Sequence, residues 1–261
     1  MRIAVVGGGV AGLYTVWHLA GRHEVVLVER AGRIGGHTDT HLVDVDPGPL
    51  DVDPAPVAVD TGFIVFNPPN YPLFSAWLEE LGVHSQPSDM SFGVHCEITG
   101  LEYNATSLSR LFCQRRNLLN PRFIGMVRDI LRFYRRAPVL LERLDERVTL
   151  GEWLETSGLG EAFGRDHLVP MAAALWSSPG RAIREFPMKY LIEFMRNHDM
   201  LQAAGRPVWR TVEGGSQRYV EAALKRFDGQ VLTGRAVHSI QRLSAGGVRL
   251  VADGFDTVVD Q

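Results

Sequence analysis

A glycine pattern, Gly7-x-Gly9-x-x-Gly12, stands near the N-terminus between two stretches of different periodicity. Residues 3–6 are all apolar and rich in β-branched side chains, which is typical of a buried parallel strand. Apolar residues then recur at helical spacing over residues 10–20, which predicts a helix. The glycine pattern therefore predicts a tight turn between a strand and a helix.

A second buried strand is predicted over residues 24–29, and it ends on Glu29. Strand, helix and parallel strand within about thirty residues form one βαβ unit. In such a unit Gly7 permits the tight turn, Gly9 lets a pyrophosphate approach the backbone, and Gly12 lets helix and strand pack closely. The helix N-terminus favours the pyrophosphate charge, and the Glu29 carboxylate can accept hydrogen bonds from ribose hydroxyls. The pattern predicts a dinucleotide site.

Length and charge limit the remaining possibilities. A chain of 261 residues can form one large or two interleaved domains, and its formal net charge of −3 predicts no nucleic-acid partner. Cys96 and Cys113 lie far apart without ligand-like spacing, so no metal site is expected. The first apolar run is too short for a signal peptide or a membrane span, which favours a cytoplasmic location.

The sequence pattern changes from strands to helices at Tyr71, and strands return near the C-terminus. Turn formers over residues 43–58 predict a surface hairpin or excursion, and residues 91–97 alternate as a strand does. Paired glycines, Gly214 and Gly215, precede a helix through residue 227. The other predicted helices are 72–81, 121–144, 149–157, 159–176 and 187–200, and the late strands are 230–233, 236–242, 248–252 and 255–259.

This order of elements predicts an α/β fold with a Rossmann-like domain and a mostly helical inserted domain. The chain would leave the nucleotide domain, build the helical insertion, and return to add strands. The predicted nucleotide domain is discontinuous and consists of residues 1–70 and 206–261. The predicted helical substrate domain consists of residues 71–205.

The stretch that follows the second predicted strand carries Glu29, Arg33 and the pair Gly35-Gly36. This Glu-x-x-x-Arg-x-Gly-Gly pattern resembles the flavin-containing amine oxidase superfamily, which includes monoamine oxidases, protoporphyrinogen oxidases and phytoene-desaturase-like enzymes. Within it, the chain resembles a bacterial group of predicted NAD/FAD-binding oxidoreductases. That likeness is carried by stretches spread over nearly the whole chain, residues 60–67, 86–92, 170–177 and 209–216.

The resemblance implies that the nucleotide domain binds FAD. Gly35 and Gly36 would pass close to the flavin and the pyrophosphate, and Arg33 would support the phosphate side. His37 stands where many amine oxidases have arginine; an ordinary hydrogen bond, tuning of the flavin charge and a covalent link are the alternatives. Val237 would contact adenine through its backbone, or else belong to the core. The expected cofactor-binding residues are Gly7, Gly9, Val10, Ala11, Gly12, Glu29, Arg30, Arg33, Gly35, Gly36, His37, Thr61, Gly62 and Val237.

The same resemblance implies an FAD-dependent oxidoreductase that removes hydride from a small hydrophobic substrate, with an amine or an unsaturated acyl lipid as candidates. Family members continue beyond residues 255–259 to a segment that covers the flavin, so the chain is expected to be truncated and no catalytic residue is assigned. The alternative is a dinucleotide-binding protein without turnover. An NAD-dependent dehydrogenase would leave Arg33 and Gly35-Gly36 unexplained.

The segment from Arg110 to Arg136 is basic and amphipathic. Besides its arginines, the segment contains a single acidic residue, Asp129. Apolar residues such as Phe123 and Phe133 alternate with the arginines. One hypothesis is that this segment contacts anionic lipid, peripheral to the inner face of the membrane. The alternative is a solvated helix face with a core stripe.

Overall fold

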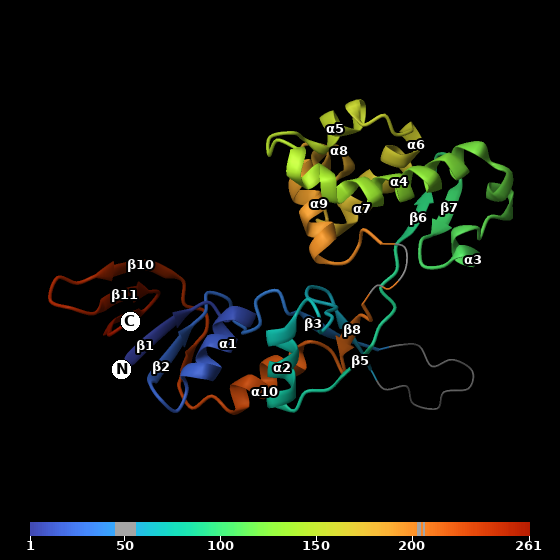
Figure 1. Ribbon diagram of the computed structural model, residues 1–261. Coiled ribbons are helices and arrows are strands. Elements are labelled where there is room, and N and C mark those ends of the chain that lie inside the picture. Colours follow the sequence, from blue (N-terminus) through green and yellow to red (C-terminus); the bar gives the residue numbers. More distant parts are fainter. Residues whose placement is uncertain (45–55, 203–204, 206) are drawn as a thin grey trace, which may run out of the picture. The chain divides into compact units, whose positions relative to one another are not determined.

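The computed structural model describes residues 1–44, 56–202, 205 and 207–261 (Figure 1). Most of the predicted excursion over residues 43–58 therefore lies outside the described residues. The chain divides into two compact units. The first unit consists of Met1–Ser88 and Val208–Gln261, and the second consists of Asp89–Pro207.

A three-stranded parallel sheet forms the centre of the first unit. Its strand order is β1-β2-β9, and the strands are β1 (Arg2–Val6), β2 (Glu24–Val28) and β9 (Gln230–Leu232). Every residue of β2 from Val25 to Val28 is buried, and the two sets of alternating side chains belong to two different cores. This burial on both faces explains why the strand sequence is continuously apolar.

Helices cover one face of this sheet and an antiparallel sheet covers the other. The core on the helical side holds Val25 and Leu27, whereas Val26 and Val28 pack against Leu250 and Ala252. The helices are α1 (Val10–Leu19), α2 (Pro72–Leu81) and α10 (Gln217–Lys225). The antiparallel strands are β10 (Val237–Arg242), β11 (Val248–Ala252) and β12 (Phe255–Val259).

Helix α2 belongs to the first unit, although the sequence pattern predicts it as the first helix of the inserted domain. Its buried residues Trp77, Leu78 and Leu81 share a core with Leu13 and Val16 of α1. The first boundary between the two units therefore lies after Ser88 rather than after residue 70. The reason is that the hydrophobic face of α2 packs on the nucleotide-domain helices, which the helical pattern alone does not specify.

Two small antiparallel pairs complete the first unit. Strands β3 (Thr40–Val43) and β4 (Val57–Asp60) pair on either side of the part of the chain that is outside the described residues. Strands β5 (Ser85–Pro87) and β8 (Arg210–Val212) pair where the chain leaves and re-enters this unit. Neither β5 nor β8, each three residues long, is predicted by the sequence pattern.

The second unit is mostly helical, and its longest helix is α4 (Pro121–Arg143). A hairpin of β6 (Gly93–Cys96) and β7 (Leu101–Asn104) precedes it; β6 was predicted and β7 was not. The shorter helices are α3 (Leu108–Leu111), the 3-10 helix η1 (Arg115–Leu119), α5 (Leu150–Thr156), α8 (Gly180–Ile183) and α9 (Met188–Asn197). Within the described ranges, none of the helices combines the length and apolar character needed to cross a bilayer.

The helix predicted over residues 159–176 is confirmed for residues 161–175, which are helical throughout, but a π-helical turn lies within it. The helix is divided into α6 (Glu161–Phe163), the π-helix η2 (Gly164–Leu168) and α7 (Val169–Leu175). Pro170 explains the interruption, because it has no backbone N–H to donate to the carbonyl oxygen of Asp166. That oxygen instead accepts a hydrogen bond of 2.9 Å from the Tyr103 hydroxyl group.

Candidate functional site

The first glycine turn lies between β1 and α1, as the sequence predicts. Gly7 has a φ of +99°, and its N–H donates to Val28 O of β2 at 2.8 Å. A Cβ on Gly12 would lie 1.8 Å from Gly7 O, so helix α1 can approach the turn this closely only with glycine there. Gly7 therefore allows the turn, and Gly12 allows the close packing of helix on strand.

The N-terminus of α1 has open space beside it in the part of the chain that the structure describes. Gly9 is the N-cap residue, and no side chain caps the helix there. Among the described residues other than its two chain neighbours, a Cβ on Gly9 would have only Gly36 Cα within 4 Å, at 3.9 Å. The backbone N–H groups of the first turn, which have no partners inside the helix, are available to an anion.

The second glycine pair packs directly on the first turn. The Gly35 N–H donates to Gly8 O at 2.9 Å, and a Cβ on Gly36 would lie 2.9 Å from Gly9 Cα. Both residues of the pair have positive φ values, +136° for Gly35 and +60° for Gly36, which favour glycine. Two loops that are separate in sequence thus form one backbone surface at the helix N-terminus.

Glu29 follows β2 and holds the neighbouring loops through its carboxylate. One oxygen accepts from the Gly8 N–H at 2.6 Å, and the other accepts from the Ala31 N–H at 2.7 Å. Burial raises the pKa of Glu29, but the N–H groups of Ala31, Gly8 and Arg30 outweigh this effect and lower the pKa below its ordinary value. The carboxylate is therefore ionised and fixed in orientation, and its remaining lone pairs can accept hydrogen bonds from ribose hydroxyl groups.

Arg33 organises the loop that contains the second glycine pair. Its guanidinium donates to Thr38 O at 2.6 Å and to Gly36 O at 3.3 Å, and it forms an ion pair of 3.1 Å with Asp39. These contacts hold the loop backbone in its turn. Arg33 is therefore positioned to support the loop, whereas Arg30 is exposed, and its backbone N–H and its charge lower the pKa of Glu29.

A pocket of about 490 Å³ lies against the two glycine loops. Six of the predicted residues line it, and five further residues that the sequence did not single out complete it. The predicted set is Gly9, Val10, Ala11, Gly35, Gly36 and His37, and the additional set is Thr38, Phe63, Tyr71, Phe74 and Tyr219. Gly7, Gly12, Glu29, Arg30, Arg33, Thr61, Gly62 and Val237 lie outside the lining.

Aromatic side chains form one wall of this pocket. Phe74 packs edge-on against Phe63 and Tyr219, each with ring centroids 5.3 Å apart. The Tyr219 hydroxyl is hydrogen bonded to the buried Thr38 hydroxyl, and burial raises the pKa of Tyr219. Tyr71 likewise has a pKa raised by burial. Both phenols are therefore neutral, and the wall offers a flat ligand apolar contact.

Helix α10 is anchored so that Tyr219 reaches the pocket. The carboxylate of Asp60 accepts from the Ser216 N–H at 2.9 Å and from the Ser216 hydroxyl at 2.9 Å. A Cβ on Gly215 would lie 2.3 Å from Thr40 Cγ2, so glycine is required for this close approach. The paired glycines before a predicted helix indicate a turn there, but Asp60, the partner of the following Ser216, lies 156 residues away in sequence.

Thr61 and Gly62 support the site from outside the pocket, whereas Val237 belongs to the core on the other face of the sheet. A Cβ on Gly62 would lie 1.8 Å from His37 O, and the Thr61 hydroxyl donates to an Asp39 carboxylate oxygen at 3.0 Å. Val237 begins β10 and packs against the core beneath the sheet. The glycine at 62 thus keeps the His37 backbone against β4, which positions one end of the pocket lining.

Comparisons with known proteins agree with this geometry. Residues 5–81 match the family described as an NAD(P)-binding Rossmann-like domain. No curated protein sequence matches the chain.

Solved structures resemble the whole chain. Cyclohexylamine oxidase from Brevibacterium oxydans IH-35A matches with a TM-score of 0.71 and 18% identity, covering 99% of this chain and 56% of that one. Putrescine oxidase bound to putrescine matches with a TM-score of 0.69 and 19% identity, covering 100% and 57%. A fatty acid isomerase from P. acnes, which produces CLA, matches with a TM-score of 0.59 and 17% identity, covering 99% and 57%.

These likenesses establish the fold. The chain is an α/β protein with a Rossmann-like dinucleotide-binding domain, and it shares the fold of the two amine oxidases and the isomerase. The fold expected from the superfamily resemblance is therefore confirmed. The chain spans somewhat more than half the length of these solved proteins.

Proposed function

We propose that this chain binds FAD and belongs to an oxidoreductase that takes hydride from a small hydrophobic substrate. The observation that carries the proposal is the contact between the two glycine loops at the N-terminus of α1. The turn at Gly9 would receive the pyrophosphate, and Glu29 would receive the ribose of the ADP half. Bound FAD would supply the redox chemistry, while the residues of the chain bind and orient it.

The second glycine loop favours FAD over NAD as the cofactor. A single glycine turn and Glu29 would suffice to hold the ADP half of either dinucleotide. Gly35 and Gly36 bring a further backbone surface to the same helix terminus, and Arg33 holds that loop in place. The aromatic wall formed by Phe63, Phe74 and Tyr219 offers an apolar surface for a flat ring. Binding of NAD would not require this second loop.

The proposed substrate is small and hydrophobic, with an amine or an unsaturated acyl lipid as the two candidates. Support for these classes comes from relatives of the same fold that include two amine oxidases and a fatty acid isomerase. The competing proposal is a dinucleotide-binding chain without turnover.

The test is a visible absorbance spectrum of the purified chain before and after incubation with FAD and removal of the excess. We expect a flavin spectrum, release of FAD on denaturation, and a Tm that rises with FAD but not with NAD. A chain that stays colourless after incubation and is stabilised only by NAD would refute the FAD proposal. Bleaching of the bound flavin by an amine or an unsaturated acyl lipid in the absence of oxygen would favour turnover over binding alone.

We also propose that the segment from Arg110 to Arg136 makes peripheral contact with anionic lipid. The apolar residues Phe123 and Phe133 are buried in the helical unit, so they cannot face a membrane. The support comes instead from Leu108 and Leu119, which are 78% and 90% exposed beside the arginines of this segment.

Co-sedimentation with vesicles of phosphatidylcholine and phosphatidylglycerol tests this contact. We expect salt-sensitive binding that is weaker with phosphatidylcholine alone. Leu119→Glu should reduce it, whereas the matched control Leu73→Glu, at a residue 69% exposed in the first unit, should not. Equal binding by both variants and the unchanged chain would remove this segment from the proposal.

A further inference from the structure

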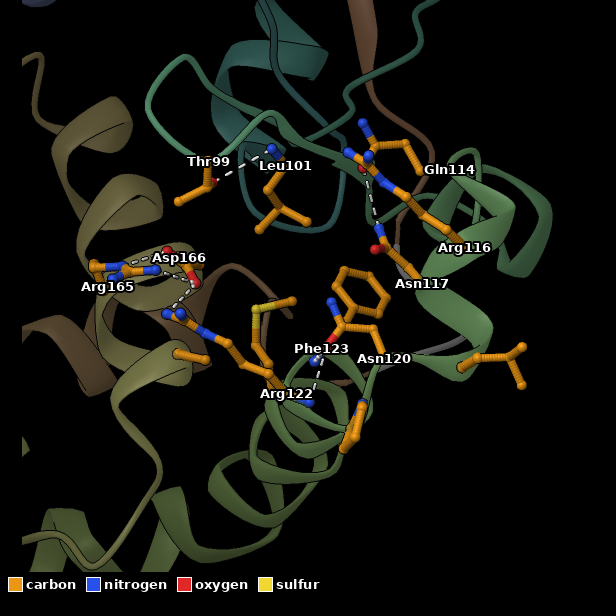
Figure 2. Close-up of a pocket in the computed structure, with 14 residues that line it drawn as sticks. Thr99, Leu101, Gln114, Arg116, Asn117, Asn120, Arg122, Phe123, Arg165 and Asp166 are labelled. Atoms are coloured by element: carbon orange, nitrogen blue, oxygen red, sulfur yellow. Dashed lines mark hydrogen bonds and ion pairs between the residues drawn. The ribbon is translucent and has the colours of Figure 1, made fainter.

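The helical unit contains a second pocket of about 500 Å³ that the cofactor proposal does not use. It lies where η1, the first turn of α4 and η2 meet the turn between β6 and β7. Three arginines, Arg116, Arg122 and Arg165, line it together with a single acid, Asp166 (Figure 2). The lining is therefore more basic than the chain as a whole.

Two of these arginines share one carboxylate. Asp166 is only 6% exposed, and its carboxylate accepts from Arg122 Nη2 at 3.1 Å and from Arg165 Nε at 2.8 Å. Arg165 also approaches Glu161 at 3.4 Å, but Glu161 is 78% exposed, so solvent weakens that pair. Two guanidinium charges against one buried carboxylate leave this side of the pocket positive.

A third cation and two amides lie across the pocket from this group, as Figure 2 shows. Arg116 and Gln114 both donate to Gly100 O, at 3.1 and 2.7 Å, which fixes their side chains near the pocket. Asn117 is 2% exposed and donates to the Gln114 side-chain oxygen at 3.3 Å. Hydrogen-bond donors thus surround the pocket from η1, α4 and η2.

Most of the remaining lining is apolar, apart from Thr99 and Asn120. Phe123 and Met126, on the first turns of α4, are each 2% exposed. The other apolar residues of the lining are Leu101, Leu119, Pro121 and Ala162. Charged donors at the edge and an apolar wall between them suit a ligand with an anionic group and a hydrocarbon part.

We propose that this pocket binds a phosphate monoester that carries an apolar group. Phosphate fits better than a carboxylate because its oxygens point in several directions, and the guanidinium groups of Arg116, Arg122 and Arg165 come from three different elements. A carboxylate has two oxygens in one plane, and one guanidinium can bind both of them, so it does not need donors from three elements. The pocket lies within the helical unit, so this site is independent of the proposed cofactor site.

Isothermal titration calorimetry of the full chain with hexyl phosphate tests the proposal, with inorganic phosphate and hexanol as comparison ligands. We expect hexyl phosphate to bind more tightly than inorganic phosphate, and hexanol not to bind. Arg116→Ala should weaken hexyl phosphate binding by about tenfold to a hundredfold, because one charged hydrogen bond is lost. Arg116 is exposed and does not contact Asp166, so Tm should be preserved.

The matched control is Arg115→Ala, which removes the same charge from the neighbouring residue of η1. Arg115 is exposed and does not line the pocket, so its variant should bind hexyl phosphate as the unchanged chain does. Equal weakening by the two variants would overturn the proposal, because it would indicate general attraction of anions to η1. Absence of hexyl phosphate binding, or equal affinity for inorganic phosphate, would overturn it as well.

Discussion

Replacing Gly9 by alanine should impair cofactor binding while leaving the fold intact. In the part of the chain that the structure describes, the nearest atom to a methyl group on Gly9, apart from its chain neighbours, would be Gly36 Cα, at 3.9 Å. The Gly9 backbone is extended, with φ −74° and ψ −178°, and alanine adopts it without strain. Because alanine is a poorer N-cap than glycine, we expect a loss of folding stability of about 1 kcal/mol. In a chain of this size that lowers Tm by roughly 2–4 °C.

The same methyl group would occupy the space where the pyrophosphate is proposed to bind. Overfilling a close-packed contact costs about 1–3 kcal/mol. The affinity for FAD should therefore fall roughly fivefold to a hundredfold. Titration with FAD, followed by flavin fluorescence, measures this change, and thermal melts of the same samples without FAD measure stability.

Two other alanine variants serve as controls. Gly32→Ala adds a methyl group that meets nothing within 4 Å, so it should change neither affinity nor Tm appreciably. Gly12→Ala places Cβ 1.8 Å from Gly7 O, so α1 must move and both quantities should fall. If Gly9→Ala binds FAD as tightly as the unchanged chain, or is as unstable as Gly12→Ala, the space beside Gly9 is not the pyrophosphate site.

Three further substitutions test interactions at the site and at a helix end. Because the pKa of Glu29 is lower in the folded than in the unfolded chain, its carboxylate stabilises the fold fully above the ordinary carboxyl pKa. This stabilisation is lost as the pH falls through the lowered pKa. In Glu29→Gln, the free energy of unfolding, measured with urea at several pH values, should therefore fall less steeply in acid. An unaltered fall would contradict the reasoning. Tyr219→Phe removes the hydroxyl partner of buried Thr38 and should cost about 1–3 kcal/mol in chemical denaturation; an unchanged unfolding free energy would count against this bond. Thr149→Ala breaks the capping box with Glu152 and should cost about 1 kcal/mol, which thermal melts would detect.

The site was predicted best where its residues are close together in sequence. The turn at Gly7 and the close packing of Gly12 follow from a strand and a helix joined by a few residues, and both have the predicted geometry. The second glycine pair was also identified, and its contact with the first turn explains why glycine is needed there. Phe74 and Tyr219 were missed, because each reaches the pocket from a helix whose sequence pattern signals only burial, and Thr38 of the second glycine loop was not assigned to the site.

Local pattern also decided the limits of several elements. Helix α2 begins at Pro72, whose fixed φ suits the first helical turn. It ends before Gly82, whose left-handed backbone conformation favours glycine. Strands β11 and β12 likewise have the predicted ends. The helix over residues 159–176 is likewise confirmed, and only its π-helical turn, which Pro170 explains, does not follow from the helical periodicity.

Side-chain periodicity and the conformational limits of glycine and proline act over a few residues, so the βαβ unit and its cofactor turn can be inferred from the chain alone. The partners of each hydrophobic face cannot be inferred in this way. Helix α2 packs on α1 rather than on the inserted helices, and the hydrogen bond between Thr38 and Tyr219 joins residues 181 apart. Such pairings depend on complementary shape and polar satisfaction across the whole core, so they are decided only when the elements pack together.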